Sequence, residues 1–306
     1  MNDAYRQLLD STIHHLESLK ARGSGFVPVE ADTLASLAAP VAAAVPPSPL
    51  AKPAAVPFAT RINVRPEPAK PRPVAAPAPA STVFTSVSAA ASILGVVPES
   101  LDEAMAQLRE KALACVRCPN LAAARKSVVF GVGDIRSPLM FVGEAPGEDE
   151  DVQGEPFVGK AGQLLTKIIE TMGLSRQTVY IANILKCRPD TPGETAGNRK
   201  PTLDEMKTCS PYLLAQIELI KPKAIVALGG TAVEGLLGNF TGIMKLRGSW
   251  QTFRGIPVMP TYHPAFLLRN QALGEKRKVW EDMLKVLERL SLPITDKQRG
   301  FFLPKD

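Results

Sequence analysis

Four cysteines carry the clearest metal-binding chemistry in this 306-residue chain. Cys115 and Cys118 form a CxxC pair, whereas Cys187 and Cys209 follow far along the sequence. Four thiolates suit either a tetrahedral zinc site or an iron–sulfur cluster. The spacing cannot choose between these metals, and the long gap before Cys187 matches no common zinc-ribbon or ferredoxin pattern. Buried free thiols are therefore a third interpretation.

A loop crowded with carboxylates follows the first apolar segment of the C-terminal region. It runs from Gly143 to Asp151 and contains five acidic residues. Gly143 and Gly147 would allow a ligand to approach the backbone closely. A ligand-binding loop, a solvated turn and a divalent-metal site are all compatible with this composition.

Three further residues have side chains suited to binding a flat, polar ligand. Phe157 lies in a loop between Pro and Gly, where it could stack on a ring or pack against the next helix. The Asn183 amide offers a donor and an acceptor, which can read the edge of a nucleobase, although a lone Asn often only completes a turn. His263 could stabilise a developing negative charge as a hydrogen-bond donor or a cation, or serve a structural role.

Short apolar segments alternate with helical patterns between residues 99 and 290. Such alternation predicts an α/β fold, here a three-layer α/β/α domain with a central, mainly parallel, four-stranded sheet. The expected strands are 139–142, 179–181, 224–228 and 256–259. The expected helices are 101–115, 162–172, 203–220, 231–237 and 276–290.

The order of motifs and strands predicts where the site lies. Ligands of open α/β sheets bind beyond the carboxyl ends of the strands. The acidic loop, Asn183 and His263 each follow an expected strand. We therefore expect them to meet at one edge of the sheet.

The first 98 residues differ from the rest in composition. Residues 1–22 place apolar side chains at helical spacing, which predicts a short amphipathic helix that either docks on a protein partner or merely tethers the chain. Residues 23–98 are rich in Ala and Pro. We expect a disordered linker there, because few large apolar groups are available to offset an ordering cost of about 1 to 2 kcal/mol per residue. Residues 99–306 are predicted to be the folded domain.

Bulk composition narrows the class of protein. The net charge is +6 and the isoelectric point about 9.1. This favours polyanionic partners such as nucleic acid, but would also suit an ordinary basic enzyme. The sequence shows neither a transmembrane stretch nor an export signal, so we expect a cytoplasmic protein without a membrane partner, whose thiols stay reduced or bind metal.

Taken together, these motifs resemble the family 4 uracil-DNA glycosylases, the iron–sulfur branch of the uracil-DNA glycosylase superfamily. The resemblance covers about residues 101–290 and includes the four cysteines. The motifs, in order, are GEAPG at 143–147, GEPFVG at 154–159, Asn183 with KCRP at 186–189, and YHPA at 262–265.

The resemblance implies an activity and a cofactor. Residues 99–306 would be a glycosylase domain that hydrolyses the bond between uracil and deoxyribose in DNA, leaving an abasic site and starting base-excision repair. A 4Fe-4S cluster with a structural role would be held by Cys115, Cys118, Cys187 and Cys209. No other metal or nucleotide is expected in the chemical step.

The resemblance also implies how uracil would be held. Phe157 would stack on the flipped base, Asn183 would bond its O4 and N3 edge, and His263 would stabilise O2 as the base departs. Glu150 would lie near C5, where it excludes the methyl group of thymine. The acidic loop would contribute four further binding residues: Gly143, Glu144, Ala145 and Pro146.

One departure from the superfamily affects the hydrolytic water. The better-known branch has an aspartate where Ala145 stands in this chain. Glu144 is then the residue expected to position water, as the second catalytic residue beside His263. We expect Glu144→Gln to cost less activity than His263→Ala.

Residues after His263 are expected to contact DNA. Leu267 and Leu268 are candidate apolar wedges, and a solvated helix face is the alternative for the lysines near them. The candidate phosphate-binding cations are Arg269, Lys276, Arg277 and Lys278. The expected partner is uracil-containing DNA, and the expected oligomeric state is a monomer.

Two other functions are compatible with parts of the sequence. One is a superfamily glycosylase with another base preference, such as hypoxanthine, or one that becomes covalently trapped on the abasic sugar. The trapping type carries a basic loop with a histidine, whereas residues 245–250 contain none. The other is a non-catalytic nucleic-acid-binding module of a replication or repair complex, which the presence of Asn183 and His263 disfavours.

Overall fold

The computed structural model describes residues 88–189, 199–238 and 242–303. The helix expected at residues 1–22, with its proposed protein partner, lies outside these ranges. So does the part of the expected linker before Ser88.

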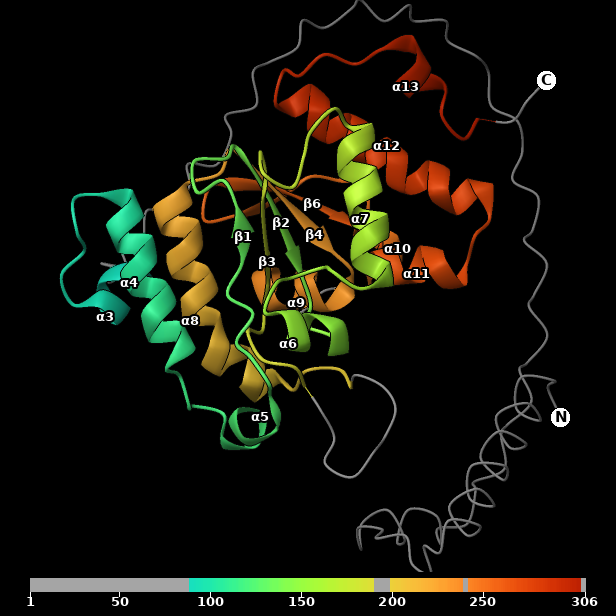
Figure 1. Cartoon of the computed structure of the whole chain (residues 1–306). Helices are drawn as coiled ribbons and strands as arrows, with labels where there is room; N and C mark the ends of the chain where they lie inside the picture. The colour runs from blue at the N-terminus through green and yellow to red at the C-terminus, as the bar shows by residue number, and fades with distance from the viewer. Residues whose placement is uncertain (1–87, 190–198, 239–241, 304–306) are drawn as a thin grey trace, which may run out of the picture. The chain divides into compact units, whose positions relative to one another are not determined.

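A six-stranded sheet forms the centre of the fold (Figure 1). Its spatial order is β1-β3-β2-β4-β6-β5, in which the four central strands are parallel and the two outer strands are antiparallel. The strands are β1 (Val132–Gly133), β2 (Leu139–Gly143), β3 (Tyr180–Asn183), β4 (Ala224–Leu228), β5 (Gln251–Phe253) and β6 (Ile256–Thr261).

Helices of the described ranges surround this sheet. Those before β3 are α3 (Ala89–Leu94), α4 (Leu101–Leu113), α5 (Pro119–Ala124), α6 (Glu148–Gln153) and α7 (Lys160–Thr171). Those after β3 are α8 (Leu203–Ile220), α9 (Gly230–Leu237), α10 (Ile243–Leu246), α11 (Pro264–Arg269), α12 (Leu273–Arg289) and α13 (Asp296–Gly300).

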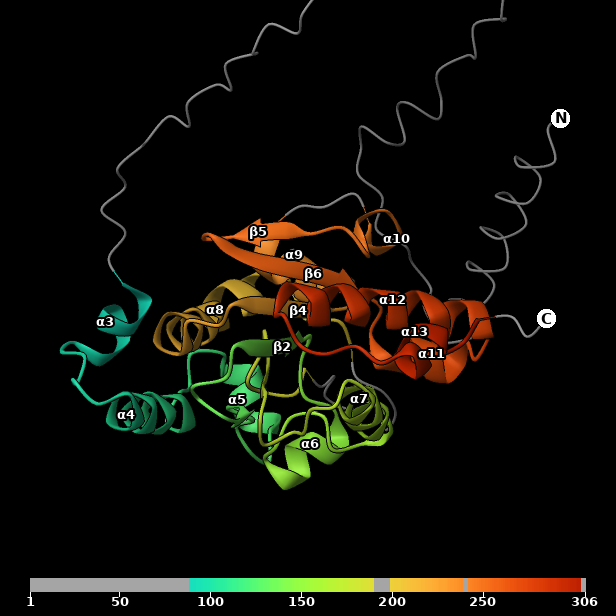
Figure 2. The same cartoon turned by 90° about the horizontal axis from the view of Figure 1, so that it is seen from above.

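Different helices cover the two faces of the sheet (Figure 2). Successive residues of a strand point to opposite faces. In β2, Met140 and Val142 belong to the apolar cluster that includes α4, α8 and α9. Leu139 and Phe141 belong to the cluster that includes α7 and α12. The three-layer α/β/α architecture is therefore confirmed, with every central strand buried on both sides.

The prediction of four strands was wrong in number, because it omitted both edge strands. β1 has two residues and β5 has three, too few to produce a periodic pattern. β5 joins β6 through Arg254 and Gly255, whose φ angles are 48° and 82°. Two consecutive positive φ angles are typical of the type I′ turns that close tight hairpins.

The predicted linker, residues 23–98, extends too far towards the C-terminus. Residues 89–94 form α3, and its Ala90 and Leu94 side chains are buried in the same cluster as α8. Folded structure therefore begins no later than Ser88, before the predicted boundary at residue 99. The Ala-rich sequence concealed this helix, because alanine suits both a linker and a well-packed short helix.

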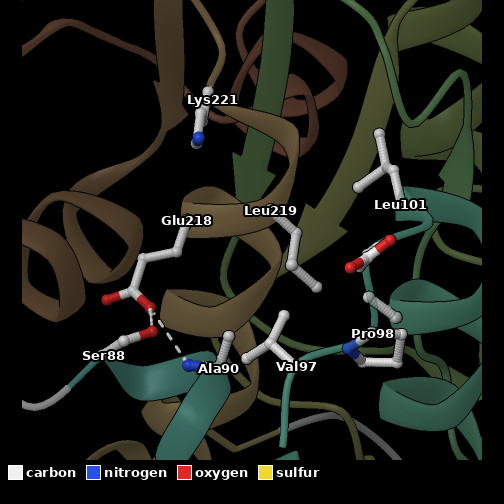
Figure 3. Close-up of a pocket in the computed structure, with 10 residues that line it drawn as sticks. Ser88, Ala90, Val97, Pro98, Leu101, Glu218, Leu219 and Lys221 are labelled. Carbon is white, nitrogen blue, oxygen red and sulfur yellow. Dashed lines mark hydrogen bonds between the residues drawn. The ribbon is translucent and has the colours of Figure 1, made fainter.

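A cavity of about 490 Å³ lies between α3, α4 and the end of α8 (Figure 3). The Glu218 carboxylate accepts hydrogen bonds there from the Ser88 hydroxyl at 2.7 Å and the Ala90 N–H at 3.0 Å. Lys221, another lining residue, lies just before β4. The cavity is thus at the amino-terminal edge of the sheet, opposite to where the site is expected.

No described helix is long and apolar enough to span a bilayer.

Candidate active site and cysteine cluster

The central strands bring the predicted site residues to one edge of the sheet. Gly143 is the last residue of β2, Asn183 is the last residue of β3, and His263 lies two residues beyond β6. The Ile184 N–H donates to the Gly143 carbonyl at 3.0 Å, which holds the first two strand ends together. This is the edge at which open α/β sheets bind ligands.

Gly143 forms the floor of the candidate site, because a side chain there would collide with its neighbours. A Cβ atom at this position would lie 2.4 Å from both Asn183 Oδ1 and Phe157 Cζ. The Phe157 and His263 ring centroids are 5.7 Å apart, with their planes tilted by 31°. Phe157, Asn183 and His263 therefore surround one small region above Gly143.

Phe157 is held in an unusual backbone conformation. Its φ angle is 57°, which costs a residue with a side chain about 1–3 kcal/mol unless its surroundings enforce it. Arg176 donates to the Phe157 carbonyl at 3.0 Å and to the Pro156 carbonyl at 2.7 Å. Gly162 packs directly below, where a Cβ would lie 1.9 Å from the Phe157 carbonyl carbon. Arg176 and Gly162 thus fix the ring beside Gly143.

The Asn183 side chain has an unsatisfied acceptor. The residue is only 1% exposed, and its Oδ1 atom is buried without a hydrogen-bond partner in the described part of the chain. Leaving a buried acceptor unpaired costs about 1–3 kcal/mol. A ligand with an N–H group at this position would remove that cost. This favours ligand reading over the alternative role of Asn183 as a turn residue.

His263 is the N-cap of α11 and is held in one tautomer. Its Nδ1 atom accepts a hydrogen bond from the Ala265 N–H at 3.1 Å, so the proton of the neutral ring is on Nε2. Burial lowers the pKa of His263 to about 4, with a further lowering by Arg269 and an opposing effect of Glu150. At neutral pH the His263 ring is therefore neutral and carries its N–H on Nε2, which is the form that the donor role expected from the sequence requires.

The Glu150 carboxylate holds two loops together. It accepts hydrogen bonds from the backbone N–H groups of Gly147, Val158 and Gly159, each at 3.0 Å. This carboxylate therefore connects the acidic loop to the segment that carries Phe157. It also lies close enough to His263 to influence its pKa.

The other residues of the acidic loop differ in burial and in their hydrogen bonds. Asp151 is 2% exposed and accepts hydrogen bonds from the backbone N–H groups of Lys126 and Ser127. Pro146 is buried, and Ala145 packs against the core. The Glu144 carbonyl accepts from the Leu185 N–H at 3.1 Å. Glu144 as a whole is partly exposed.

The four cysteines line one small cavity despite their distance in sequence. Cys115 follows α4, Cys118 is the N-cap of α5, Cys187 follows β3, and Cys209 lies within α8. Two donors face their sulfurs: Arg125 contacts Cys187 Sγ at 3.2 Å, and a backbone N–H contacts Cys209 Sγ at 3.2 Å. Convergence of all four thiols is unlike the scattered burial of unrelated free cysteines.

A positive charge near these thiols would stabilise their ionised form, which three of them disfavour. Burial raises the pKa of Cys118 and Cys187, and raises that of Cys209 to about 12. Mutual repulsion among the sulfurs adds to each effect. In the described ranges, no group of three or more His, Cys, Asp or Glu side chains could hold a metal ion.

The candidate DNA-binding cations are not equivalent. Arg277 donates to Glu281 and to two backbone carbonyls of the C-terminal segment. Lys278 forms an ion pair with Glu275 at 2.8 Å. Arg269, in contrast, is exposed at the end of α11, close to His263. Of these three, Arg269 is best placed to meet a phosphate near the site.

The two candidate wedge residues are also distinguished. Leu267 is 4% exposed and packs in an apolar cluster, whereas Leu268 is 39% exposed. Lys276 is partly buried and lines the same apolar pocket as Leu267. Of the two leucines, Leu268 is therefore the one with an exposed side chain.

A family model described as the uracil DNA glycosylase superfamily matches residues 130–284, which include the β2, β3 and β6 strand ends. The chain belongs to the uracil DNA glycosylase superfamily. The match covers half of the chain and all residues placed above Gly143. The superfamily assignment made from the motifs is thereby confirmed.

Among relatives within the uracil DNA glycosylase superfamily, type-4 enzymes are more similar to this chain than a type-5 enzyme is. A type-4 uracil-DNA glycosylase from Thermotoga maritima is 44% identical over 188 residues, which are 60% of this chain and 93% of that protein. One from Saccharolobus solfataricus is 44% identical over 191 residues, covering 59% and 84%. A type-5 uracil-DNA glycosylase from Pyrobaculum aerophilum is 30% identical over 208 residues, covering 57% and 87%. The predicted resemblance to type 4 is confirmed.

Proposed function

We propose that this protein is a uracil-DNA glycosylase that hydrolyses the N-glycosidic bond of uracil in DNA, leaves an abasic site and so initiates base-excision repair. The observation that carries the proposal is the buried Asn183 Oδ1, which has no hydrogen-bond partner among the described residues and lies in the group formed with Phe157 and His263. Uracil has an N–H donor at N3 next to a carbonyl acceptor at O4. An asparagine amide complements both atoms.

This complementarity explains discrimination against cytosine. The Asn183 Oδ1 would accept from uracil N3–H while Nδ2 donates to O4. Cytosine presents an acceptor at N3 and a donor at its 4-amino group, so both contacts would be mismatched. Unpaired polar groups in a dry pocket cost enough to give strong selectivity. The base must first leave the duplex, at a cost of a few kcal/mol.

His263 would act on the departing base. As the glycosidic bond breaks, negative charge moves onto uracil and is concentrated in part on O2. The Nε2–H of neutral His263 would donate to O2, and backbone groups of Glu144 and Ala145 would help to hold the base. Phe157 would stack on it. The Glu144 carboxylate would position the water that attacks the sugar.

Thymine would be excluded through the position of the loops. The three backbone hydrogen bonds to Glu150 fix the acidic loop against the segment of Phe157. We propose that Glu150 limits the space beside C5 in this way, so that a 5-methyl group does not fit.

The cysteine cavity fits an iron–sulfur cluster as the proposed cofactor. Cys115, Cys118, Cys187 and Cys209 would hold a 4Fe-4S cluster, which would supply structural cross-linking of α4, α5, β3 and α8. Its charge would stabilise thiolates that burial otherwise disfavours. The contacts from Arg125 and the Lys186 N–H resemble the hydrogen bonds that cluster sulfurs receive in such sites.

The proposed function is tested by base release from matched oligonucleotides. The purified full chain is incubated with duplexes that carry uracil, hypoxanthine or thymine at one position, and abasic sites are cleaved with alkali. We expect cleavage of the uracil strand alone. Release of hypoxanthine instead would indicate another base preference, and binding without cleavage would indicate a non-catalytic module.

The rate of uracil release should be nearly independent of pH around neutrality. Because the pKa of His263 is about 4, the ring stays neutral from about pH 6 to pH 8, and we expect the single-turnover rate to vary by less than about threefold there. Stability should fall as the pH decreases from about 6.5 towards 4, since the unfolded state then binds the proton more tightly. A rate that rises about tenfold per unit below pH 6.5 would mean that the imidazolium is the active form.

Removal of the Arg269 charge should weaken DNA binding in a salt-dependent manner. For Arg269→Ala we expect the slope of log K against log salt to become shallower by about one, because one phosphate contact is lost. Lys223→Ala is the matched control, since Lys223 is exposed at the opposite, amino-terminal edge of the sheet. Equal slopes for Arg269→Ala and the unmodified protein would remove Arg269 from the DNA-binding surface.

A further inference from the structure

Lys186 is a buried cation that has no carboxylate partner among the described residues. Its side chain is 1% exposed and is among the largest that are fully buried. The described ion pairs do not include it. A buried ammonium without compensation is strongly unfavourable. Its position therefore needs an explanation that packing alone does not give.

The contacts of Lys186 connect two sites. Its Nζ atom donates to the Asn183 carbonyl at 3.1 Å and to Gln216 Oε1 at 2.7 Å, and it lies 5.9 Å from the centre of the Phe130 ring. Its backbone N–H donates to Cys209 Sγ at 3.2 Å. Lys186 thus contacts both a cysteine of the cavity and Asn183, the residue whose side-chain Oδ1 has no partner among the described residues.

Gln216 fixes the ammonium from the other side. It is fully buried in α8, and its Nε2 donates to the Phe130 carbonyl at 3.0 Å and to the Tyr180 hydroxyl at 2.9 Å. All of its polar atoms are therefore used, and the amide orientation that presents Oε1 to Lys186 is set by these contacts. The network holds the end of β3 against α8, the helix that carries Cys209.

We propose that Lys186 is a positioning residue that couples the cysteine site to the uracil-reading Asn183. This inference rests on the proposed function and concerns the same site. The Lys186 ammonium holds the backbone carbonyl of Asn183 and so limits the direction of the Asn183 side-chain amide. The backbone N–H of Lys186 connects the same turn to Cys209 Sγ. Cys209 and the other three cysteines, as thiolate ligands of the proposed cluster, would supply the negative charge that Lys186 otherwise lacks. Loss of either contact leaves Asn183 free to shift from its position above Gly143.

The test uses Lys186→Met, which keeps the length of the side chain but removes its charge and its donors. Lys207→Met, on the exposed face of α8, is the matched control. Four quantities are measured on the full chain: the single-turnover rate of uracil release, the Kd for the uracil duplex, the thermal unfolding midpoint, and the rate at which a chelator bleaches the visible absorption. A displaced recognition group should lower the rate about 10- to 100-fold. The Kd should change less than about twofold, because phosphate contacts dominate DNA affinity.

We also expect the chelator to bleach Lys186→Met at least about threefold faster than the control, since the substitution removes the cation and frees the turn whose backbone N–H donates to Cys209 Sγ. A rate within about twofold of the unmodified protein would overturn the link to Asn183. A parallel loss of rate, DNA affinity and thermal stability would overturn positioning in favour of a general structural role. Unchanged bleaching would overturn the link to the cysteine site.

Gln216→Leu provides a second test if Lys186→Met does not fold. It removes one acceptor of the same ammonium and should lower the rate by a smaller factor, about three- to tenfold, again without weakening DNA binding. A folded Gln216→Leu protein with unchanged rate and bleaching would overturn the proposal. If the unmodified protein releases no uracil, the proposed function fails, while the bleaching comparison still tests the contact between Lys186 and the cysteine site.

Discussion

Replacing His263 with alanine should lower the single-turnover rate of uracil release by about 10²–10³-fold, the usual effect of removing one preorganised donor from a developing oxyanion. The imidazole is already oriented, because the Ala265 N–H holds Nδ1 and leaves Nε2–H to donate. It is also already neutral, since burial lowers its pKa to about 4. Neither a proton transfer nor a rotation of the ring is then needed before uracil departs.

His263→Asn is the control that separates catalysis from helix capping. His263 caps α11, and asparagine is an equally good N-cap, whereas alanine costs about 1 kcal/mol of stability. We expect His263→Asn to melt like the unmodified protein and yet to lose most of the rate, because its shorter amide does not reach O2. Near-normal activity of His263→Asn would show that the histidine serves the helix rather than the base.

Glu144→Gln should cost less than His263→Ala. Glu144 is expected to position water, and a glutamine can still hold water by hydrogen bonds, so a loss of about tenfold or less is expected. Single-turnover rates of the two variants on the same duplex provide the comparison. The reverse order would assign the principal catalytic role to the carboxylate.

The edge of the sheet that carries the site could be predicted because chain order determines it. In a parallel sheet, residues that follow different strands meet at one edge whatever the length of the intervening helices. Gly143, Asn183 and His263 were therefore placed correctly relative to the strands. The edge strands β1 and β5 could not be predicted, because two or three residues show no periodicity and their pairing depends on a sheet that is already formed.

The contacts that hold the site together were beyond sequence reasoning. Arg176 reaches the carbonyls of Pro156 and Phe157 from 20 and 19 residues away, and no local pattern marks such a pairing. Gln216 lies 30 residues from Lys186, and in the sequence it is only one polar residue in a largely apolar helical pattern. Glu150 was predicted to face the base, yet its backbone partners arise only after two loops are brought together. Contacts between side chains far apart in the sequence depend on the fold, whereas a sequence motif shows only residues that are close together in the chain.

The cysteines illustrate the same limit in a different way. The CxxC pair was recognisable, but the 68 residues between Cys118 and Cys187 contain α5 to β3, and this spacing resembles no compact metal motif. Three-dimensional structure removes this difficulty, since the end of α4 and the middle of α8 lie side by side with the turn after β3. Convergence of all four thiols, rather than their spacing, is what makes a shared ligand the best explanation.

Cys187→Ala should therefore prevent binding of the proposed cluster and lower the unfolding midpoint by about 10 °C or more. Ligand binding to a structural metal site contributes directly to folding free energy, and about 1 kcal/mol corresponds to 2–4 °C for a domain of this size. Three thiols would remain, and burial raises the pKa of two of them, Cys118 and Cys209, so that their ionised forms are disfavoured. Arg125, which now donates to Cys187 Sγ, would lose its partner as well.

Thr208→Ala is the matched control, because Thr208 lines the same cavity without offering a thiolate. Iron and acid-labile sulfide per chain, the visible spectrum and the thermal midpoint are measured for all three proteins. Iron retained by Cys187→Ala would remove this cysteine from the ligand set. Stoichiometric zinc in the unmodified protein would replace the proposed cluster but keep the ligands. Absence of both metals, with an unchanged midpoint in Cys187→Ala, would return the four cysteines to buried thiols whose convergence stabilises the fold by packing alone.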